Sequence, residues 1–242
     1  MLVHSGVTDS GEWEAVRPLL AAEHLVVAPD LPGSGSIPLQ PGELSLSEYL
    51  LGAFDGAAAL VGTSWGGRLV LEAALVAPER IEKLVLINAN PFGWSEDVQR
   101  VGEQEDSLVE AGRFEEAGEL MARWWLAGPQ REPDDVDGAL YERVRSMAVR
   151  GYELQAGVDA SFRRVEIEPA RISAPTLVVR GALDWPDVAV AAERLVRELP
   201  DAREAVIDDC AHLPALERPD EVARLVLDFL AEGPDAPPQP GR

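Results

Sequence analysis

Ser64 lies at the centre of the segment Gly62-Thr63-Ser64-Trp65-Gly66, which has the pattern G-x-S-x-G. A short apolar run precedes the pattern, and a stretch able to form a helix follows it. On such a strand-to-helix turn a serine hydroxyl stands clear of the sheet, and the glycines let strand and helix approach closely. The pattern therefore predicts a nucleophilic serine, which needs an adjacent base to become reactive.

The base is expected among the three histidines of the chain. His4 lies in the first predicted strand, and His24 lies just before the second. His212 follows the last predicted strand, and parallel sheets place their sites in the loops at the carboxyl ends of strands. We therefore expect His212 to be the general base.

A carboxylate is needed to orient this histidine through its other ring nitrogen. Asp184 comes just after the apolar run 176–179, which gives the chain order serine, aspartate, histidine. Asp187 is the main competitor, because the loop could shift by one turn. Asp208 and Asp209 are so close in sequence to the histidine that we expect them to cap its loop instead.

A tetrahedral intermediate on the serine also needs hydrogen-bond donors for its oxyanion. The backbone amide of Trp65, directly after the nucleophile, is expected to supply one of them. The loop after the first predicted strand, residues 4–8, is expected to supply the other through Gly6 or, failing that, Val7.

Strand-like and helix-like patterns alternate along the segments that carry these residues. Such alternation predicts an α/β fold, with a mostly parallel sheet of about six strands flanked by helices. The expected strands are 2–4, 25–28, 57–61, 84–88, 176–179 and 205–207, and the expected helices are 12–22, 65–77, 187–199, 219–231 and a short one around 46–54.

The alternation breaks between residues 91 and 172, where apolar and aromatic residues repeat at helical spacing throughout. We interpret residues 91–172 as an inserted helical cap between the core segments 1–90 and 173–232. Residues 233–242 contain four prolines and no periodicity, which predicts a disordered tail.

Composition limits the classes of partner. The formal net charge of −22 would repel nucleic acid and anionic membranes. A single cysteine, Cys210, excludes an intramolecular disulfide and fits the cytoplasm. We find neither an apolar stretch long enough for a membrane span nor a signal-peptide pattern. We expect a cytoplasmic protein, monomeric or homodimeric, that acts on a small molecule.

The predicted cap is rich in aromatic residues, which predicts an apolar substrate cleft. The residues expected to line it are Trp94, Met121, Trp124, Trp125, Trp185 and Leu213. Few basic residues are expected near the site, which favours an uncharged, largely apolar substrate. Arg68 is expected to pair with Glu72 at i, i+4 rather than to bind a substrate carboxylate.

Taken as a set, these segments resemble the α/β-hydrolase fold family, in its cap-bearing group of esterases, lactonases, C–C hydrolases and epoxide hydrolases. The matching segments are 2–6, 28–36, 62–67, 181–184 and 212–219, nearly the whole chain outside the cap and tail. The resemblance implies a triad of Ser64, His212 and Asp184, with the amides of Gly6 and Trp65 as oxyanion hole. It also implies no metal and no organic cofactor.

The chain departs from this family's pattern in three places. It opens directly on the strand that carries the oxyanion loop, whereas relatives usually have an antiparallel hairpin before it, so either the sheet lacks that hairpin or the natural start lies upstream. Ser5 follows His4 where relatives usually have glycine. The stretch 30–62 is short, so its predicted helix around 46–54 is shorter than in relatives. A shortened helix would leave apolar area of the sheet exposed, which either dimerisation covers or which makes the fold only marginally stable.

The leading hypothesis is a serine hydrolase of an apolar carboxylic ester or lactone that forms an acyl-enzyme on Ser64. Epoxide hydrolases and haloalkane dehalogenases use a carboxylate nucleophile instead. A C–C bond hydrolase or a biosynthetic enzyme with the same triad is an alternative, as is a ligand receptor or regulatory protein with little turnover. The motif Gly-Thr-Ser-Trp-Gly-Gly is also similar to that of some prolyl aminopeptidases, which are a minor alternative.

Overall fold

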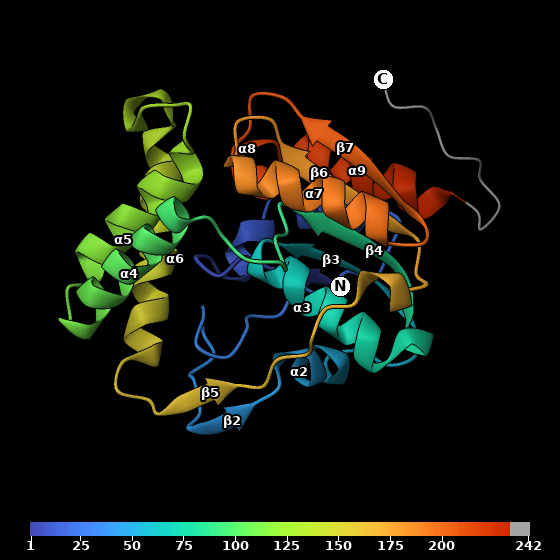
Figure 1. The fold of residues 1–242 in the computed structure, drawn as a ribbon, viewed down its shortest axis with the longest axis horizontal. Coiled ribbons are helices and arrows are strands. Elements are labelled where there is room, and N and C mark those ends of the chain that lie inside the picture. The colour runs from blue at the N-terminus through green and yellow to red at the C-terminus, as the bar shows by residue number, and fades with distance from the viewer. Residues whose placement is uncertain (233–242) are drawn as a thin grey trace.

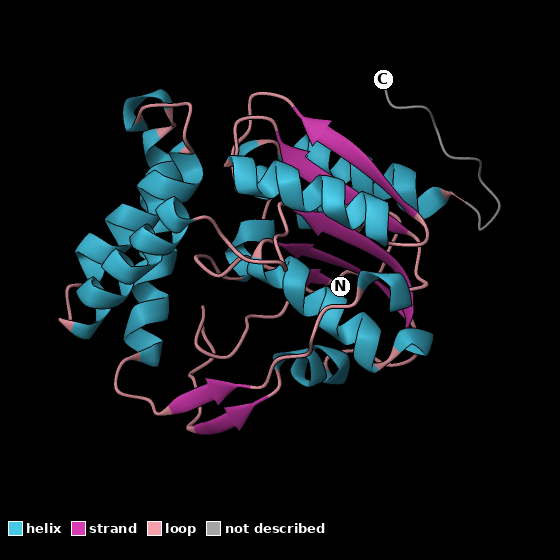
Figure 2. Cartoon of the chain, in the orientation of Figure 1, coloured by secondary structure: helices cyan, strands magenta, loops and turns pink. Residues whose placement is uncertain are grey.

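The computed structural model describes residues 1–232, so the predicted tail 233–242 lies outside the described residues. A parallel sheet of five strands forms the centre of the molecule, in the order β1-β3-β4-β6-β7 (Figures 1 and 2). The strands are β1 (Leu2–Val3), β3 (Ala58–Thr63), β4 (Ile81–Ile87), β6 (Thr176–Gly181) and β7 (Ala202–Ile207). Because all are parallel, their carboxyl ends meet at one edge of the sheet, and the loops after β3, β6 and β7 are neighbours there.

Helices cover both faces of this sheet and bury two separate apolar clusters. The helices α2 (Leu46–Gly52), α3 (Trp65–Val76) and α7 (Pro186–Glu198) pack on one face, against side chains such as Leu84 and Leu86. The helices α1 (Val16–Leu20) and α9 (Pro219–Ala231) pack on the other, against Val85 and Ile87. Successive residues of β4 thus point to opposite faces, and both faces are buried, which explains the continuous apolar run.

The sheet has one strand fewer than expected. Residues 25–28 run beside β1, but one backbone hydrogen bond, from Leu2 N to Val27 O at 2.8 Å, joins the two segments. Leu25 is 95% exposed, so the apolar residues of this segment are not all buried as a central strand requires. The run is therefore a loop along the edge of the sheet.

The first expected helix is also divided. A 3₁₀ turn, η1 (Ser10–Trp13), precedes α1. Pro18, within α1, has no amide hydrogen to donate to the preceding turn, so the two pieces are not joined into one helix.

A second, two-stranded parallel sheet pairs β2 (Gly42–Leu44) with β5 (Ala160–Phe162). The expectation that residues 91–172 are helical throughout is therefore wrong at β5. Each strand is three residues long, too short for an alternating pattern to identify it. Their pairing joins the loop after residue 30 to the end of the helical segment (Figure 1).

The remaining helices lie beside the carboxyl edge of the main sheet (Figure 1). They are α4 (Glu96–Glu110), α5 (Phe114–Ala122), a π-helical turn η3 (Arg123–Ala127), η4 (Pro133–Asp135) and α6 (Gly138–Gln155), and we call them the helical insertion. Short turns η2 (Pro78–Arg80), η5 (Pro169–Arg171) and α8 (Pro214–Glu217) complete the elements. Within residues 1–232, no helix combines the length and apolarity needed to cross a bilayer.

Candidate active site

Ser64 occupies the sharp turn between β3 and α3. Its backbone has φ 51° and ψ −112°, a left-handed conformation that a residue with a side chain rarely adopts. Such strain costs about 1–3 kcal/mol and persists only where the surroundings impose it. Here the Ser64 amide donates to Ile87 O at 2.8 Å, which ties the turn to β4.

The glycines of the G-x-S-x-G pattern are required by close backbone approach. A Cβ placed on Gly62 would lie 2.4 Å from Gly66 O, and one placed on Gly66 would lie 2.4 Å from Val3 O. Both distances are far below van der Waals contact, and the atoms met are backbone atoms that cannot rotate away. The two glycines thus allow α3 to begin directly against β1 and β3.

We expect Gly66→Ala to destabilise the fold by about 1–3 kcal/mol, as overpacking does, and to displace the start of α3. Gly102→Ala is the matched control, because Gly102 is also helical and has open space around it. That control should hold or raise the melting temperature, since alanine favours the helix by about 1 kcal/mol. Equal melting temperatures for the two variants would contradict the close approach.

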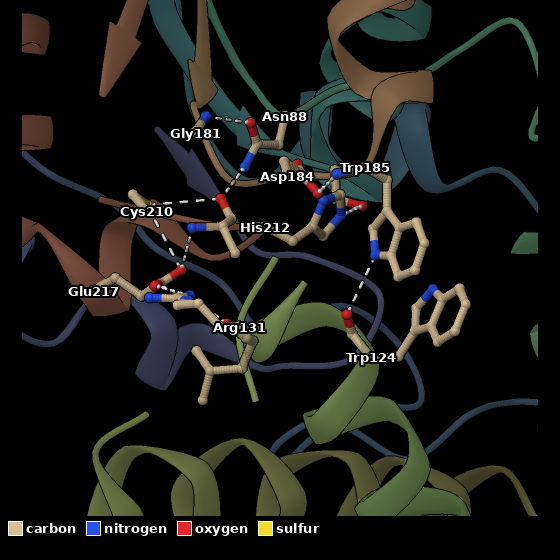
Figure 3. A network of polar contacts seen from close by, with 12 residues as sticks. Asn88, Trp124, Arg131, Gly181, Asp184, Trp185, Cys210, His212 and Glu217 are labelled. Carbon is tan, nitrogen blue, oxygen red and sulfur yellow. Dashed lines mark hydrogen bonds and ion pairs between the residues drawn. The ribbon is translucent and has the colours of Figure 1, made fainter. Parts of the chain in front are cut away.

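His212 and Asp184 meet Ser64 in one chain of hydrogen bonds. His212 Nε2 lies 2.9 Å from Ser64 Oγ, and His212 Nδ1 lies 2.7 Å from Asp184 Oδ2 (Figure 3 shows the second contact). The side chains of His212 and Asp184 are 1% and 2% exposed. Because a carboxylate only accepts, Nδ1 carries the proton and Nε2 is free to accept from the serine.

The rival carboxylates are engaged elsewhere. Asp187 accepts hydrogen bonds from Ser95 N at 2.5 Å and from Ser95 Oγ at 3.0 Å, which fastens the start of the helical insertion. Asp208 and Asp209 are exposed, and Asp209 lies 3.8 Å from Arg218. Among the four aspartates considered, Asp184 is the one that contacts His212.

The loop that carries the histidine is held by groups that the sequence did not identify (Figure 3). Buried Asn88 accepts from Gly181 N and donates to Ala211 O, both at 2.9 Å, and so ties the ends of β4 and β6 to this loop. Glu217 accepts from Ala211 N at 3.0 Å and pairs with Arg131 of the helical insertion at 2.5 Å. Apart from the contact between Ala211 and Glu217, these interactions join residues distant in sequence, which no local pattern reveals.

Cys210 is fully buried beside this loop. Burial, the largest cause, raises the pKa of its thiol, and the Glu217 carboxylate adds to the effect. The side chain is therefore a neutral packing group.

Gly6 and Trp65, whose amides are the expected oxyanion donors, lie near each other. A Cβ placed on Gly6 would lie 3.5 Å from Trp65 Cβ, so the Gly6 backbone lies close to the Trp65 side chain. Both line a cavity together with Ser64 and His212. Neither amide donates to another backbone group within the described part of the chain, so both remain free for a bound group.

The loop with Gly6 is fixed by buried polar contacts. Leu31 N donates to His4 Nε2 at 3.0 Å, so His4 Nδ1 carries the proton and donates to Ser5 O at 2.7 Å. The Ser5 amide donates to buried Glu12 at 2.8 Å, and the Ser5 hydroxyl lies 2.9 Å from Thr8 Oγ1. Ser5 therefore braces the loop through both its amide and its hydroxyl.

The cavity beside these groups has a volume of about 720 Å³. Of the six residues expected to line it, Trp94 and Trp125 do so. The other four lie outside it, a correction to the sequence-based expectation for Met121, Trp124, Trp185 and Leu213. Trp124 stacks on Trp185 with ring centroids 4.0 Å apart, while Met121 and Leu213 are buried in packing. Consecutive residues of a helical turn point in different directions, and in η3 Trp125 lines the cavity while Trp124 packs on Trp185.

Charged groups also line the cavity, contrary to the expectation of few basic residues near the site. Arg68 pairs with Glu72 at 2.9 Å, as expected, and also donates to Pro91 O and Val165 O. Glu105 accepts from Tyr152 OH at 2.6 Å, and burial raises the pKa of its carboxyl. Arg164, which follows β5, also lines this cavity, so Arg68, Glu105 and Arg164 are its charged side chains other than histidines.

The arrangement is suited to nucleophilic chemistry. A serine hydroxyl can pass its proton to His212, whose positive charge Asp184 then stabilises. Within residues 1–232 there is no cluster of three or more histidine, cysteine, aspartate or glutamate side chains that could hold a metal ion.

Comparison with known proteins places the chain among enzymes of related architecture. Residues 1–225 match the model of the "Alpha/beta hydrolase family". A pimeloyl-[acyl-carrier protein] methyl ester esterase of Aromatoleum aromaticum is 30% identical over 95% of this chain and 97% of its own length. A 2-hydroxymuconate semialdehyde hydrolase of Pseudomonas sp. (strain CF600) is 28% identical over 96% and 86%.

The solved structure of a hydrolase from Pseudomonas aeruginosa PA01 superimposes with a TM-score of 0.78 at 28% identity, over 96% of this chain and 89% of that one. The family match extends from β1 into α9, so it includes both the main sheet and the helical insertion. On this evidence the chain belongs to the α/β-hydrolase family.

Proposed function

We propose that the protein is a serine hydrolase that cleaves a carboxylic ester through an acyl-enzyme on Ser64. The observation that carries the proposal is the continuous hydrogen-bonded chain from Ser64 Oγ through His212 to buried Asp184. A free serine hydroxyl is a weak nucleophile, and a base held at 2.9 Å is the activation it needs.

In the first half-reaction Ser64 Oγ attacks the ester carbonyl carbon and gives its proton to His212 Nε2. The carbonyl oxygen becomes an oxyanion, which the amides of Gly6 and Trp65 stabilise. The C–O bond to the alcohol then breaks, and His212 donates the proton to the departing alcohol. Asp184 keeps the imidazolium oriented and charge-balanced in this step.

In the second half-reaction a water molecule repeats the sequence on the acyl-enzyme. His212 takes a proton from the water as it attacks, and the bond to Ser64 Oγ breaks with return of that proton to the serine. The products are a carboxylic acid and an alcohol, or a hydroxy acid where the substrate is a lactone.

The cavity supports a small, mostly apolar substrate. Trp94 and Trp125 lie with ring centroids 5.4 Å apart beside His212, and Phe92 and Phe162 line the same space. A volume of about 720 Å³ is within the range of small-molecule sites. The net charge of −22 argues against nucleic acid as a partner, and the single cysteine is in keeping with a reducing compartment such as the cytoplasm.

Hydrolysis of a C–C bond is the second candidate, because one relative carries the name of a 2-hydroxymuconate semialdehyde hydrolase. The same serine, histidine and aspartate would serve it, so the substrate must discriminate. The test is a panel of short-chain p-nitrophenyl esters, lactones and vinylogous 1,5-diketones. Hydrolysis of esters or lactones that Ser64→Ala lacks would support the proposal. Turnover of the diketones alone would replace it with the second candidate.

A further inference from the structure

Arg164 lies in the cavity wall, and its guanidinium stacks on the Trp65 ring without pairing with a carboxylate of residues 1–232. It lines the same cavity as Ser64 and His212. Its Cζ atom lies 3.8 Å from the centroid of the Trp65 ring, a cation–π contact that holds the planar group in place. Trp65 therefore joins two features of the site, because its amide lies beside Ser64 and its ring lies against Arg164.

The neighbouring Arg163 shows what most arginines of this acidic chain do. Arg163 pairs with Glu48 at 2.8 Å, outside the cavity. For Arg164, in contrast, the 1–232 region offers no carboxylate within ion-pair distance and no hydrogen-bond acceptor. Arg164 thus retains its five N–H donors for a group that enters the cavity.

The charges around Arg164 favour an anion. The Arg164 side chain is exposed, and partial desolvation is the main cause that lowers the pKa of its guanidinium, with repulsion by Arg68 adding to it. Glu72 is the compensating carboxylate, but Arg68 already holds it at 2.9 Å. Arg68 and Arg164 share Glu72 as their nearby carboxylate, which leaves local positive charge beside Arg164. Glu105, the carboxylate that lines the same cavity, accepts a hydrogen bond from Tyr152, and burial raises its pKa, so it offsets this charge less.

We infer that Arg164 binds a carboxylate of the substrate, so that the preferred substrate is an ester with a second, ionised carboxyl group on an otherwise apolar body. The inference rests on the proposed ester hydrolysis and adds the charge of the substrate to it. It replaces the wholly uncharged substrate expected from the sequence. A guanidinium fixed by stacking suits a carboxylate, because its planar fork can donate two parallel hydrogen bonds.

Lysine is the conservative replacement that would separate charge from geometry. Arg164→Lys keeps a positive charge but loses the planar fork and the stacking over Trp65. It should therefore retain part of the preference that Arg164→Gln loses.

The experiment compares esters matched in length and different in charge. Monomethyl adipate against methyl hexanoate places the charge on the acyl side, and 6-acetoxyhexanoate against hexyl acetate places it on the alcohol side. We expect the wild type to prefer the charged ester of one pair. Arg164→Gln should lower the charged-to-neutral ratio of kcat/KM for that pair about 10- to 100-fold, the effect of one charged hydrogen bond. Arg163→Gln makes the same change of charge outside the cavity and should leave the ratio within about twofold, the small effect of an exposed ion pair.

The results distinguish failure of the inferred carboxylate site from failure of the proposed ester hydrolysis. Hydrolysis of the neutral esters with a ratio that Arg164→Gln does not change would overturn the inference and leave the serine hydrolase standing. Hydrolysis of none of the esters would overturn the proposed function. In that case calorimetric titration with glutarate tests Arg164 alone: binding that Arg164→Gln removes supports the anion site, and absence of binding by the wild type overturns it.

Discussion

Replacing Ser64 by alanine is expected to lower kcat for ester hydrolysis by at least about 10⁴-fold while leaving the melting temperature nearly unchanged. The size follows from the loss of the covalent step, since the remaining donors and the cavity provide only residual rate enhancement. Stability should persist because the alanine keeps the backbone of the turn and, within residues 1–232, the Ser64 hydroxyl hydrogen-bonds to no side chain other than His212. Activity is measured with the best ester of the panel, and stability by thermal unfolding.

Ser173→Ala provides the matched control, because Ser173 is exposed and lies away from the cavity. It should change kcat less than about twofold, as a surface substitution away from special features does. If Ser64→Ala retained a tenth or more of the wild-type kcat, another nucleophile would have to be responsible.

The Asp184→Asn variant is expected to have the second largest effect, a loss of about 10⁴-fold in kcat. An asparagine amide can turn its NH₂ group toward His212 Nδ1, which would move the ring proton to Nε2. Nε2 could then no longer accept the proton of Ser64. The fold should be retained, because the side chains have nearly the same shape.

Asp187→Asn is the informative comparison, since this carboxylate was the main competitor for the same role. In the structure it accepts hydrogen bonds from Ser95 and does not contact His212. An asparagine can keep one of these bonds through its carbonyl oxygen, so we expect a change in kcat of less than about threefold. A loss with Asp187→Asn as large as that with Asp184→Asn would show that the wrong aspartate has been assigned.

The residues expected to form the triad could be chosen from the sequence because their signals are local. Ser64, Asp184 and His212 each follow an apolar segment that becomes β3, β6 or β7. Once those segments are taken as parallel strands, their carboxyl ends share one edge and the following loops must be neighbours. Residue types and the order of these segments along the chain were sufficient to select the three residues.

The cavity lining could not be predicted in the same way. Trp124 and Trp125 are adjacent in sequence and equally aromatic, but the rotation of the helix turns only Trp125 toward the cavity. Arg164 reaches the cavity because β5 pairs with β2, a contact between segments more than a hundred residues apart, as Gly42 is opposite Ala160. The sequence pattern of either segment does not predict this pairing. The position of Arg164 in the cavity wall was therefore not predicted.

At the edge of the sheet, a local apolar pattern predicts a strand that the structure does not contain. Residues 25–28 have the apolar composition of a buried strand, yet Leu25 is almost fully exposed. A strand needs a ladder of hydrogen bonds along its length. The single bond to Val27 O places this segment next to β1 without making it part of the sheet.

Labelling with a fluorophosphonate probe shows directly whether His212 activates Ser64. The wild type and His212→Ala are treated in parallel, and the modified residue is located by peptide mass spectrometry. We predict a single modification on Ser64 in the wild type that is lost in His212→Ala, with both proteins folded by circular dichroism. Absence of labelling in the folded wild type, or equal labelling of Ser64 in both proteins, would contradict activation of Ser64 by His212.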